Sequence, residues 1–595
     1  MEANKSLISR SLVDVAMGRV PADLVIRNGS WVCVQSGEII PNSDIAIKGE
    51  RIAYVGENAS HSIGKETKVI DAEGRYLVPG LLDGHMHVES GMLTVTEFVR
   101  AVIPYGTTGM FVDPHEIANV FGLRGVKLMV EEATQQPIHV WVQVPSCIPS
   151  APSFETPGAV FGPAEVTEAM SWPGIIGLGE VMNFPGVFLG DEKMHLEMAE
   201  ARKAGKVIGG HYASPDLGLP FHGYVAGGPE DDHEGTRVED AVNRVRQGMK
   251  AMLRFGSAWH DVAIQIEAVT RLGLDPRHFI LCTDDSHSET LVNEGHVNRA
   301  LKEAISHGLA PITAIQMATI NPAEHFGVWR DVGMIAPGRF GDVLLVSNLT
   351  DLTVDVVIAK GKVVGEKGRV LVDIPPYPYP DWALNSIHLR RPLQATDFRL
   401  MAPGEGNFIA NVIGVIENQA PTKHLKIEVN SRSGEIHTDL NQDLAKIAVV
   451  ERHRATGGVQ VGLVSGFGFT VPCSIATTVA HDSHHMIVIG TSESDMAIAT
   501  NELARMGGGQ IVVKDGKVIG KVDLPIAGLM SNESAEVVAW KAGSILDGIK
   551  DCGCNLNNPN MQISLMALVV IPELRISDLG LVDTSKFEYI PVIDE

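Results

Sequence analysis

The sequence predicts an α/β protein whose central part is a parallel (β/α)8 barrel. Between residues 81 and 334, short apolar runs alternate with helical stretches, a pattern typical of parallel strands joined by helices. Eight such units within about 250 residues fit a barrel of this kind. β-rich segments flank this region on both sides, and a long globular segment follows it. We therefore expect a barrel, flanking β-rich segments and an additional C-terminal α/β domain.

The eight expected barrel strands are short and apolar, and most are followed by polar residues. Barrel folds carry out their chemistry with polar side chains at the carboxyl ends of the strands. The sixth strand is inferred only from the segment that precedes His233. The strands are expected to end at Asp83, within residues 110–113, 140–144, 175–180 and 206–211, before His233, and within residues 251–254 and 279–284.

The segments outside the barrel have their own patterns. Residues 23–56 consist of short β-rich runs separated by Asn-Gly and Ser-Gly turns, which predicts a small antiparallel sheet. A similar β-rich segment returns over residues 338–364. The proline-rich residues 375–380 predict a stiff, extended linker. Beyond it, residues 385–595 have hydrophobic runs and glycine turns enough for an independent α/β domain.

Composition and charge exclude several classes of function. A formal net charge of −24 would repel a phosphate backbone, so nucleic acid is not an expected partner. The apolar runs are shorter than the ~18–20 residues that span a bilayer, and residues 1–20 lack the apolar core of a secretory signal. The 6 cysteines are scattered and do not form a disulfide framework. These observations predict a cytoplasmic protein with free thiols and no membrane partner.

His85-Met86-His87 is the motif most informative about chemistry. It follows the apolar run from Leu77 to Gly84, which predicts a buried strand ended by glycines. Two histidines one residue apart at the carboxyl end of a strand can both turn inward and supply half of a divalent-metal site. With the preceding Pro-Gly-Leu-Leu-Asp-Gly and the following Glu89, the motif resembles the first-strand signature of the amidohydrolase superfamily.

This resemblance implies a domain layout. Amidohydrolases build a split β-sandwich from both sides of their barrel, so residues 1–80 and 335–372 are expected to form such a domain. Residues 81–334 are then the metal-dependent barrel, and residues 385–595 are the C-terminal domain.

Six residues of metal-ligand type stand at the expected strand ends, in the order typical of the superfamily. Four imidazoles and two carboxylates around one barrel mouth can hold two divalent ions, with a carboxylate bridging them. The expected ligands are His85, His87, Glu180, His211, His233 and Asp284.

Glu180 narrows the resemblance to one family. Many binuclear amidohydrolases bridge their metals with a carboxylated lysine on the fourth strand, but no lysine lies within residues 171–191. A glutamate bridge, together with Asp113-Pro114-His115-Glu116 and Asp232-His233-Glu234, resembles the bacterial adenine deaminases. The similarity runs almost end to end.

Two blocks of the C-terminal segment, residues 479–485 and 524–531, are also similar to that family. His485 departs from the family pattern, which has an asparagine there. The cluster from His481 to His485 is dense in ligand types; it fits a lid over the site, an extra metal site, or a polar loop between domains equally well.

The resemblance implies hydrolytic deamination of adenine to hypoxanthine and ammonia in purine salvage. The expected cofactors are two Mn(II) or Fe(II) ions, which lower the pKa of bound water to about 7. A homo-oligomer, a dimer, is the expected assembly, with adenine as the small-molecule partner.

Two proton transfers are expected in this reaction. Asp284 is the expected carrier of the water proton to the departing ammonia. Glu116, with His115 and Asp113 as neighbours, is the expected donor to N1 of the ring, since a carboxyl among other carboxylates keeps its proton. Glu234 is the alternative donor.

Several other interpretations stay open at this point. Residues 113–116 also fit a helix N-terminus, with Asp113 as cap and an acid in the first turn. The whole chain also fits a ring-opening amidohydrolase of the dihydroorotase or hydantoinase type, although the missing lysine and the C-terminal domain argue against it. A non-catalytic metal-binding scaffold would have lost the aspartate of the eighth strand, and Asp284 is present. A redox activity of a bound iron pair also suits these ligands.

Overall fold

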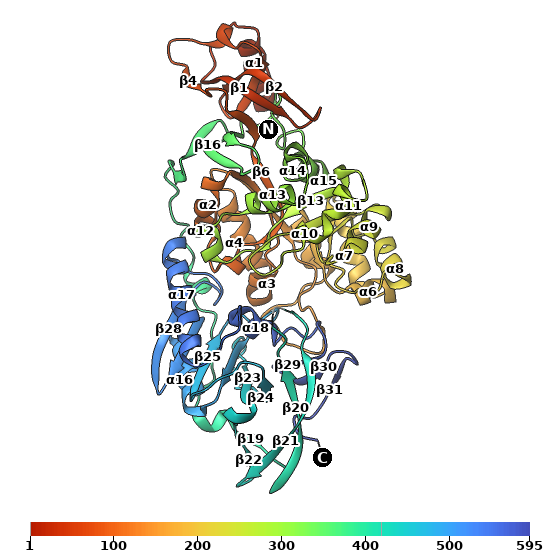
Figure 1. The fold of residues 1–595 in the computed structure, drawn as a ribbon, viewed down its shortest axis with the longest axis vertical. Helices are drawn as coiled ribbons and strands as arrows, with labels where there is room; N and C mark the ends of the chain where they lie inside the picture. The colour runs from red at the N-terminus through yellow and green to blue at the C-terminus, as the bar shows by residue number, and fades with distance from the viewer. Residues whose placement is uncertain (1, 418, 595) are drawn as a thin grey trace.

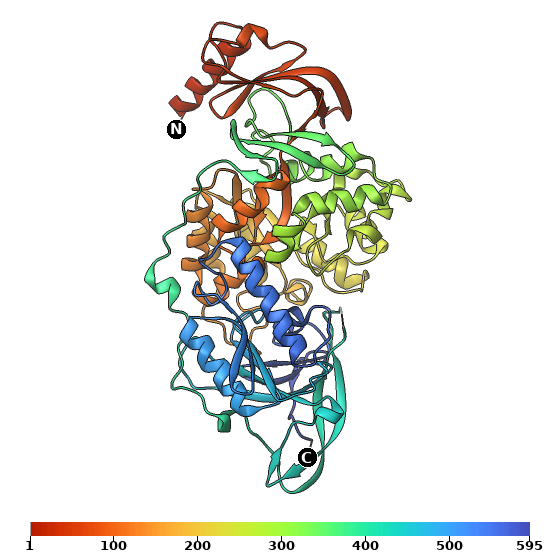
Figure 2. The same ribbon diagram turned by 60° about the vertical axis from the view of Figure 1, so that its left-hand side comes forward.

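The computed structural model describes residues 2–417 and 419–594. The chain forms an elongated molecule with three regions along its long axis (Figure 1). N-terminal strands lie at one end, parallel strands and their helices lie in the middle, and the C-terminal sheet lies at the other end (Figure 2). Among the described residues, no helix has both the length and the apolarity that crossing a membrane requires.

The first region is a nine-stranded sheet built from two distant parts of the chain. Its order is β18-β17-β16-β15-β5-β1-β2-β3, with β4 paired to β1. The two parts join where β5 pairs antiparallel with β15, with Leu77 opposite Leu345. The helix α1 (Glu2–Ala16) precedes this sheet. Its strands are β1 (Leu24–Cys33), β2 (Glu38–Lys48), β3 (Arg51–Gly56), β4 (Lys68–Asp71), β5 (Tyr76–Pro79), β15 (Val343–Asn348), β16 (Thr353–Ala359), β17 (Lys362–Glu366) and β18 (Arg369–Val370).

The middle region contains only parallel strands, in two sheets. One has the order β10-β9-β8-β7-β6-β14, and the other has the order β11-β12-β13. The strand β14 follows β13 at once and returns to β6, where Asp284 stands opposite Met86. Between the sheets, the Glu230 amide donates to the Ile208 carbonyl at 2.8 Å. The strands are β6 (Leu81–His87), β7 (Thr107–Val112), β8 (His139–Val144), β9 (Ile175–Val181), β10 (Val207–Gly210), β11 (Asp231–Asp232), β12 (Lys250–Arg254), β13 (Phe279–Cys282) and β14 (Asp284–Asp285).

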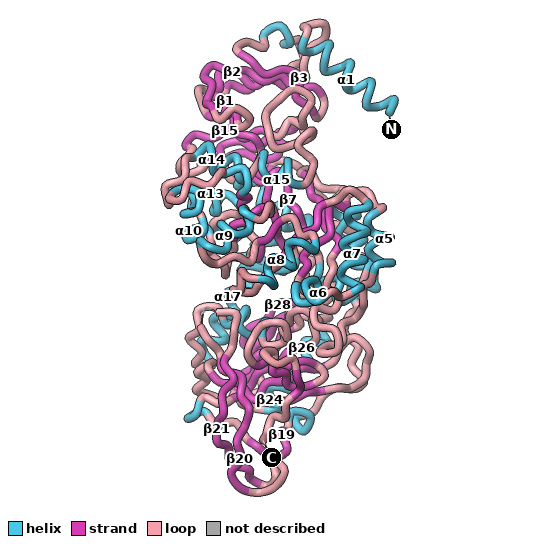
Figure 3. The backbone as a smooth tube through the Cα atoms, turned by 90° about the vertical axis from the view of Figure 1, so that its right-hand side faces the viewer, coloured by secondary structure: helices cyan, strands magenta, loops and turns pink. Residues whose placement is uncertain are grey.

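Helices connect these strands and lie outside them (Figure 3). Several begin at a capping side chain: Thr94 accepts from the Glu97 amide before α2, and Asp191 accepts from the Met194 amide before α7. The helices are α2 (Val95–Val102), α3 (His115–Phe121), α4 (Leu123–Ala133), α5 (Pro163–Met170), α6 (Phe184–Leu189), α7 (Glu192–Lys203), α8 (Leu219–Gly227), α9 (Val238–Arg246), α10 (Val262–Gln265), α11 (Glu267–Thr270), α12 (Ser288–Asn293), α13 (Val297–Ser306), α14 (Pro311–Met317) and α15 (Ile320–His325).

The C-terminal region is a ten-stranded sheet, antiparallel except where β20 and β24 pair in parallel. The helix α16 (Glu493–Met506) packs on β25 and β27, and α17 (Ala535–Asp551) packs on β28. A short helix, α18 (Pro559–Leu565), and a three-stranded sheet complete it. The strands are β19 (Leu400–Met401), β20 (Gly406–Gly414), β21 (Lys423–Arg432), β22 (Glu435–Ile436), β23 (Ala445–Val450), β24 (Val459–Ser465), β25 (Cys473–Thr477), β26 (Met486–Gly490), β27 (Gly509–Lys514), β28 (Lys517–Asp523), β29 (Leu574–Ser577), β30 (Gly580–Asp583) and β31 (Glu588–Tyr589).

The C-terminal region lies against the face of the middle region that carries α3 (Figure 1). The Ser531 amide donates to the Met92 carbonyl at 2.9 Å, just beyond the end of β6. The Thr156 amide donates to Asp578 Oδ1 at 3.0 Å. The carboxyl ends of the parallel strands therefore face the C-terminal region, whose residues are far away in the sequence.

One expected element differs from the structure. The apolar run from Leu77 to Gly84 is not a single strand; it divides at Gly80 into β5 of the first sheet and β6 of the parallel sheet. A Cβ at Gly80 would lie 2.0 Å from Thr108 Oγ1, so only glycine permits this passage between the sheets. His85 and His87 lie inside β6 rather than after it. Alternate residues of a strand point to the same side, so both rings face the same way.

Candidate metal centre

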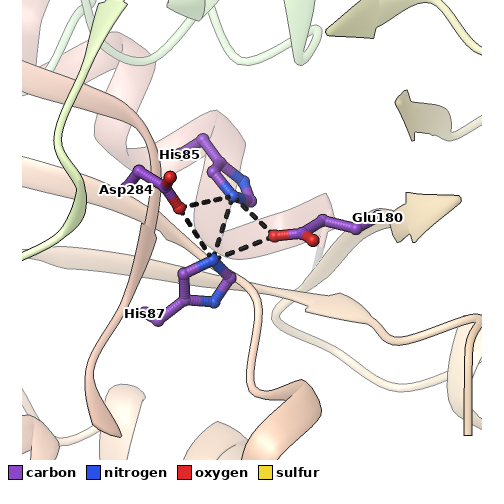
Figure 4. Close-up of side chains that lie close together, drawn as sticks. All are labelled: His85, His87, Glu180 and Asp284. Carbon is purple, nitrogen blue, oxygen red and sulfur yellow. Dashed lines mark hydrogen bonds and ion pairs between the residues drawn. The ribbon is translucent and has the colours of Figure 1, made fainter. Parts of the chain in front are cut away.

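Four of the expected ligands converge at the carboxyl ends of β6, β9 and β14. Figure 4 shows His85, His87, Glu180 and Asp284 directed toward one point. The Nε2 atoms of His85 and His87 each lie 2.9 Å from Glu180 Oε1. Asp284 Oδ1 lies 3.1 Å from His87 Nε2 and 3.7 Å from His85 Nε2. All four residues are buried.

The other two expected ligands, His211 and His233, also lie beside Glu180. His211 Nδ1 is 2.9 Å from Glu180 Oε2, and His233 Nε2 is 3.8 Å from Glu180 Oε1. The ring of His233 stacks on the ring of His85 with centroids 4.1 Å apart. Glu180 is therefore shared by two groups of ligand atoms, and the structure brings all six expected residues together.

The arrangement fits a metal centre better than a hydrogen-bond network. The Nε2 atoms of His85 and His87 point toward each other at 3.2 Å, and Glu180 Oε1 is buried without a hydrogen-bond partner. Imidazole nitrogens and carboxylate oxygens that converge at such short distances are what a divalent cation requires. His87 Nδ1 lies 2.8 Å from the Asp113 carbonyl, to which it donates, so Nε2 is left free to bind a metal.

Charges in the cluster compensate one another. Burial lowers the pKa of His87, but Glu180 and Asp284 outweigh burial and raise that pKa well above its usual value. Burial opposes ionisation of Glu180, yet His87 and His211 hold its pKa well below the usual range. Burial and the neighbouring His85 lower the pKa of His233, which keeps this imidazole neutral, the form that binds metals.

Asp113 supports this centre and does not cap a helix. Its Oδ2 accepts a hydrogen bond from the Glu180 amide at 2.8 Å. The helix α3 begins after Pro114, and no side chain caps it. The interpretation of residues 113–116 as a capped helix start is therefore wrong for Asp113, because the metal centre takes its carboxylate.

Glu116 lies in the first turn of α3, where it is only 2% exposed. Its Oε1 accepts from Ser90 Oγ at 3.5 Å, and its Oε2 is buried without a hydrogen-bond partner. Burial, and then the neighbouring Glu89, raise the pKa of Glu116 well above its usual value. The raised pKa favours the protonated carboxyl, and its unpartnered oxygen is available to a ligand.

His115 and Glu234 have different surroundings. His115 stands beside His87, with ring centroids 4.8 Å apart, and its Nδ1 lies 3.7 Å from Asp113 Oδ1. Glu234 forms an ion pair with Arg254.

Two residues of the centre were missed by sequence reasoning. Arg254 ends β12, and its Nη1 donates to Asp284 Oδ2 at 3.2 Å while its Nε donates to Asp261 at 3.0 Å. Arg254 stands at the end of an expected barrel strand, so its position in the sequence could have indicated that it is a site residue. Ser90 donates to Asp285 and to Glu116, and nothing in the sequence around it indicated this role.

His485, the departure from the family pattern, has a structural role at the interface. Its Nε2 lies 2.9 Å from the Thr156 carbonyl and 3.4 Å from Asp578 Oδ1. Its contacts therefore join the C-terminal region to the loop after β8.

Comparison with known proteins finds two protein families that match this chain. The amidohydrolase family matches residues 76–220 and 229–364, and the adenine deaminase C-terminal domain matches residues 419–588. Among solved structures, that of molinate hydrolase aligns at 14% identity with a TM-score of 0.46, over 60% of this chain and 98% of its own.

Relatives match over nearly the whole chain. Adenine deaminase 3 of Rhizobium meliloti (strain 1021) is 60% identical over 588 residues, covering 99% of both chains. Adenine deaminase of Mesorhizobium japonicum is 61% identical, covering 97% of this chain and 96% of its own. Adenine deaminase of Moorella thermoacetica is 49% identical, covering 98% of both chains. This chain therefore belongs to the adenine deaminase family.

Proposed function

We propose that this protein hydrolyses adenine to hypoxanthine and ammonia. The main support for this proposal is the position of Glu180. Its Oε1 faces His85 and His87 while its Oε2 faces His211, as a carboxylate bridging two metal ions requires. The end-to-end similarity to adenine deaminases supports the choice of substrate.

The proposed architecture places this site at the mouth of a closed (β/α)8 barrel formed by residues 81–334. The return of β14 to β6 and the hydrogen bond between Glu230 and Ile208 support closure of the two parallel sheets. Residues 1–80 with 335–372 would then form the split β-sandwich, and residues 385–595 the C-terminal domain.

Two divalent ions, Mn(II) or Fe(II), would be held by His85, His87, Glu180, His211, His233 and Asp284. Bound there, they would lower the pKa of water and so supply the nucleophile at neutral pH. Imidazole and carboxylate ligands suit both metals.

Asp284 is the proposed carrier of the proton from water to the leaving ammonia. Arg254 donates to Oδ2 of Asp284 and orients the carboxylate, so Oδ1 faces the histidines. A carboxylate held this way can accept a proton on the metal side and release it to the departing amine.

Glu116 is the proposed donor to ring N1, with Asp113 and His115 as positioning residues. Burial and the neighbouring Glu89 raise the pKa of Glu116 well above its usual value, which favours the protonated form that a general acid needs. Protonation of N1 lets the ring accept electron density during attack at C6. Glu234 is the alternative donor, but its carboxylate is already paired with Arg254, whereas one oxygen of Glu116 has no partner, so we assign the role to Glu116.

The experiment that tests this proposal is ammonia release from a panel of purine bases by Mn(II)-loaded protein. Adenine is expected to yield hypoxanthine with equimolar ammonia. Dihydroorotate and hydantoin serve as controls for ring opening. Turnover of either cyclic amide without release of ammonia from adenine would refute the proposal.

The net charge of −24 and the absence of a disulfide framework in the sequence support a cytoplasmic location. A homodimer is the assembly that we propose, and light scattering on the purified protein measures it.

A further inference from the structure

A second cluster of ligand-type side chains lies where the C-terminal region meets the parallel strands. His115 comes from the start of α3, while His481 and Asp482 come from the loop between β25 and β26. One ligand atom from each lies within 4.8 Å of the others. His115 is 6% exposed, His481 is 9% exposed and Asp482 is 2% exposed. Groups from two distant parts of the sequence therefore face one another in a buried space.

The spacing of these atoms suits a shared ion. Asp482 Oδ1 lies 3.9 Å from His115 Nε2 and 3.6 Å from His481 Nδ1. Both distances are too long for hydrogen bonds. A tetrahedral ion with bonds near 2.1 Å separates its ligand atoms by about 3.4 Å, so the three atoms stand close to the separation that such an ion imposes.

Several buried atoms around the cluster lack hydrogen-bond partners. The other oxygen of Asp482, Oδ2, is one of them. His115 Nδ1 lies 3.7 Å from Asp113 Oδ1, and both of these atoms are also buried without a hydrogen-bond partner. A second carboxyl group, that of Glu155, is buried close enough to Asp482 for their charges to interact.

The cluster also has room for solvent ligands. His481 lines a cavity of about 300 Å³ between the two regions, together with Ser90, Ser257 and Asn558. An ion with three protein ligands can complete its coordination with water from this side.

We propose that His115, His481 and Asp482 bind a further divalent transition-metal ion, separate from the ions at Glu180. Two imidazoles and one carboxylate suit Zn²⁺, Mn²⁺ and Fe²⁺. One ligand comes from the parallel-strand region and two come from the C-terminal region. The ion therefore joins the C-terminal region to the face of the middle region that carries the candidate metal centre. Binding of this ion does not require the proposed deamination, although the ion would share His115 with the proposed active site.

The test counts bound Zn²⁺ per chain by elemental mass spectrometry after equilibration in a buffer of fixed free Zn²⁺. Asp482→Asn and His481→Ala are each expected to hold one ion fewer than the wild type. Asp578→Asn removes a buried carboxylate from the same interface without touching the cluster, and is expected to keep the wild-type count. Equal counts in the wild type and both cluster variants would overturn the proposal.

Anomalous diffraction at the zinc edge locates the ion in the wild-type protein. This experiment therefore does not depend on whether a variant folds. A peak between His115 Nε2 and Asp482 Oδ1 is expected, and a map with peaks only near Glu180 would also overturn the proposal. His85→Asn separates the two sites, because it is expected to lower occupancy near Glu180 and to leave the peak at Asp482. A wild-type protein that shows this peak but releases no ammonia from adenine would count against the proposed function alone.

Discussion

Replacement of Glu116 by glutamine tests the proposed acid most directly. A general acid contributes ~10²–10⁴-fold to the rate, or ~3–5 kcal/mol of barrier. We expect the upper part of that range, because Glu116 is 2% exposed and bulk water cannot substitute for it. The amide still donates a hydrogen bond to N1, so adenine affinity should change by less than tenfold, the equivalent of ~1 kcal/mol.

The assay measures kcat, KM, metal content and melting temperature on the same preparation. Glu116 contacts Ser90 and none of the six expected ligands, so metal content should equal that of the wild type. Glu168→Gln, an exposed change on α5, is the control for loss of a carboxylate. If Glu116 only stabilises the start of α3, the variant should lose ~1 kcal/mol of stability or less and keep normal kinetics. Near-wild-type kcat in Glu116→Gln would refute the reasoning and move the role to Glu234.

Three further perturbations have defined outcomes. Asp284→Asn should keep the fold and lower kcat by ~10²–10⁴-fold, since an amide cannot carry the proton; activity that survives there but is lost in Asp285→Asn would reverse the assignment. Removal of metal with a chelator should abolish ammonia release and Mn(II) should restore it; activity in metal-free protein, checked by elemental analysis, would contradict the proposed chemistry. Burial raises the pKa of Glu197 on α7 from 4.5 to about 7, so folding loses stability as pH rises through that window, by ~3 kcal/mol above it. Glu197→Gln should therefore raise the melting temperature at pH 8 but not at pH 4.5, whereas Glu200→Gln should not; an equal gain at both pH values would refute this account.

Much of the candidate site could be predicted because it depends on local patterns. Most of the parallel strands are short apolar runs, and the strand signal also locates their ends, where His211 and Asp284 were expected. The spacing of His85 and His87 defines a common side of one strand whatever surrounds it. The boundary at Gly80 was harder to predict, because apolar residues lie on both sides of it. Only the pairing of β5 with β15 separates the first sheet from the parallel sheet.

Residue roles that depend on partners could not be predicted in the same way. Asp113 before a proline is a normal helix cap in sequence, and the competing Glu180 amide lies 67 residues away. Arg254 acquires its role only because β12 and β14 bring it beside Asp284. Nothing in the sequence near His485 indicates its role, because its partner Thr156 belongs to the loop after β8.

The sequence by itself determined the types and order of the ligand residues, the alternation of strands and helices, and the family to which the chain is similar. These properties follow from side-chain chemistry and from periodicities of a few residues. Only the tertiary structure decided that Glu180 lies among four histidines, that Asp113 accepts a hydrogen bond from the Glu180 amide, and that His481 and Asp482 lie opposite His115. Hydrogen bonds, charge compensation and burial depend on distances between residues that are remote in the chain, and folding alone sets those distances.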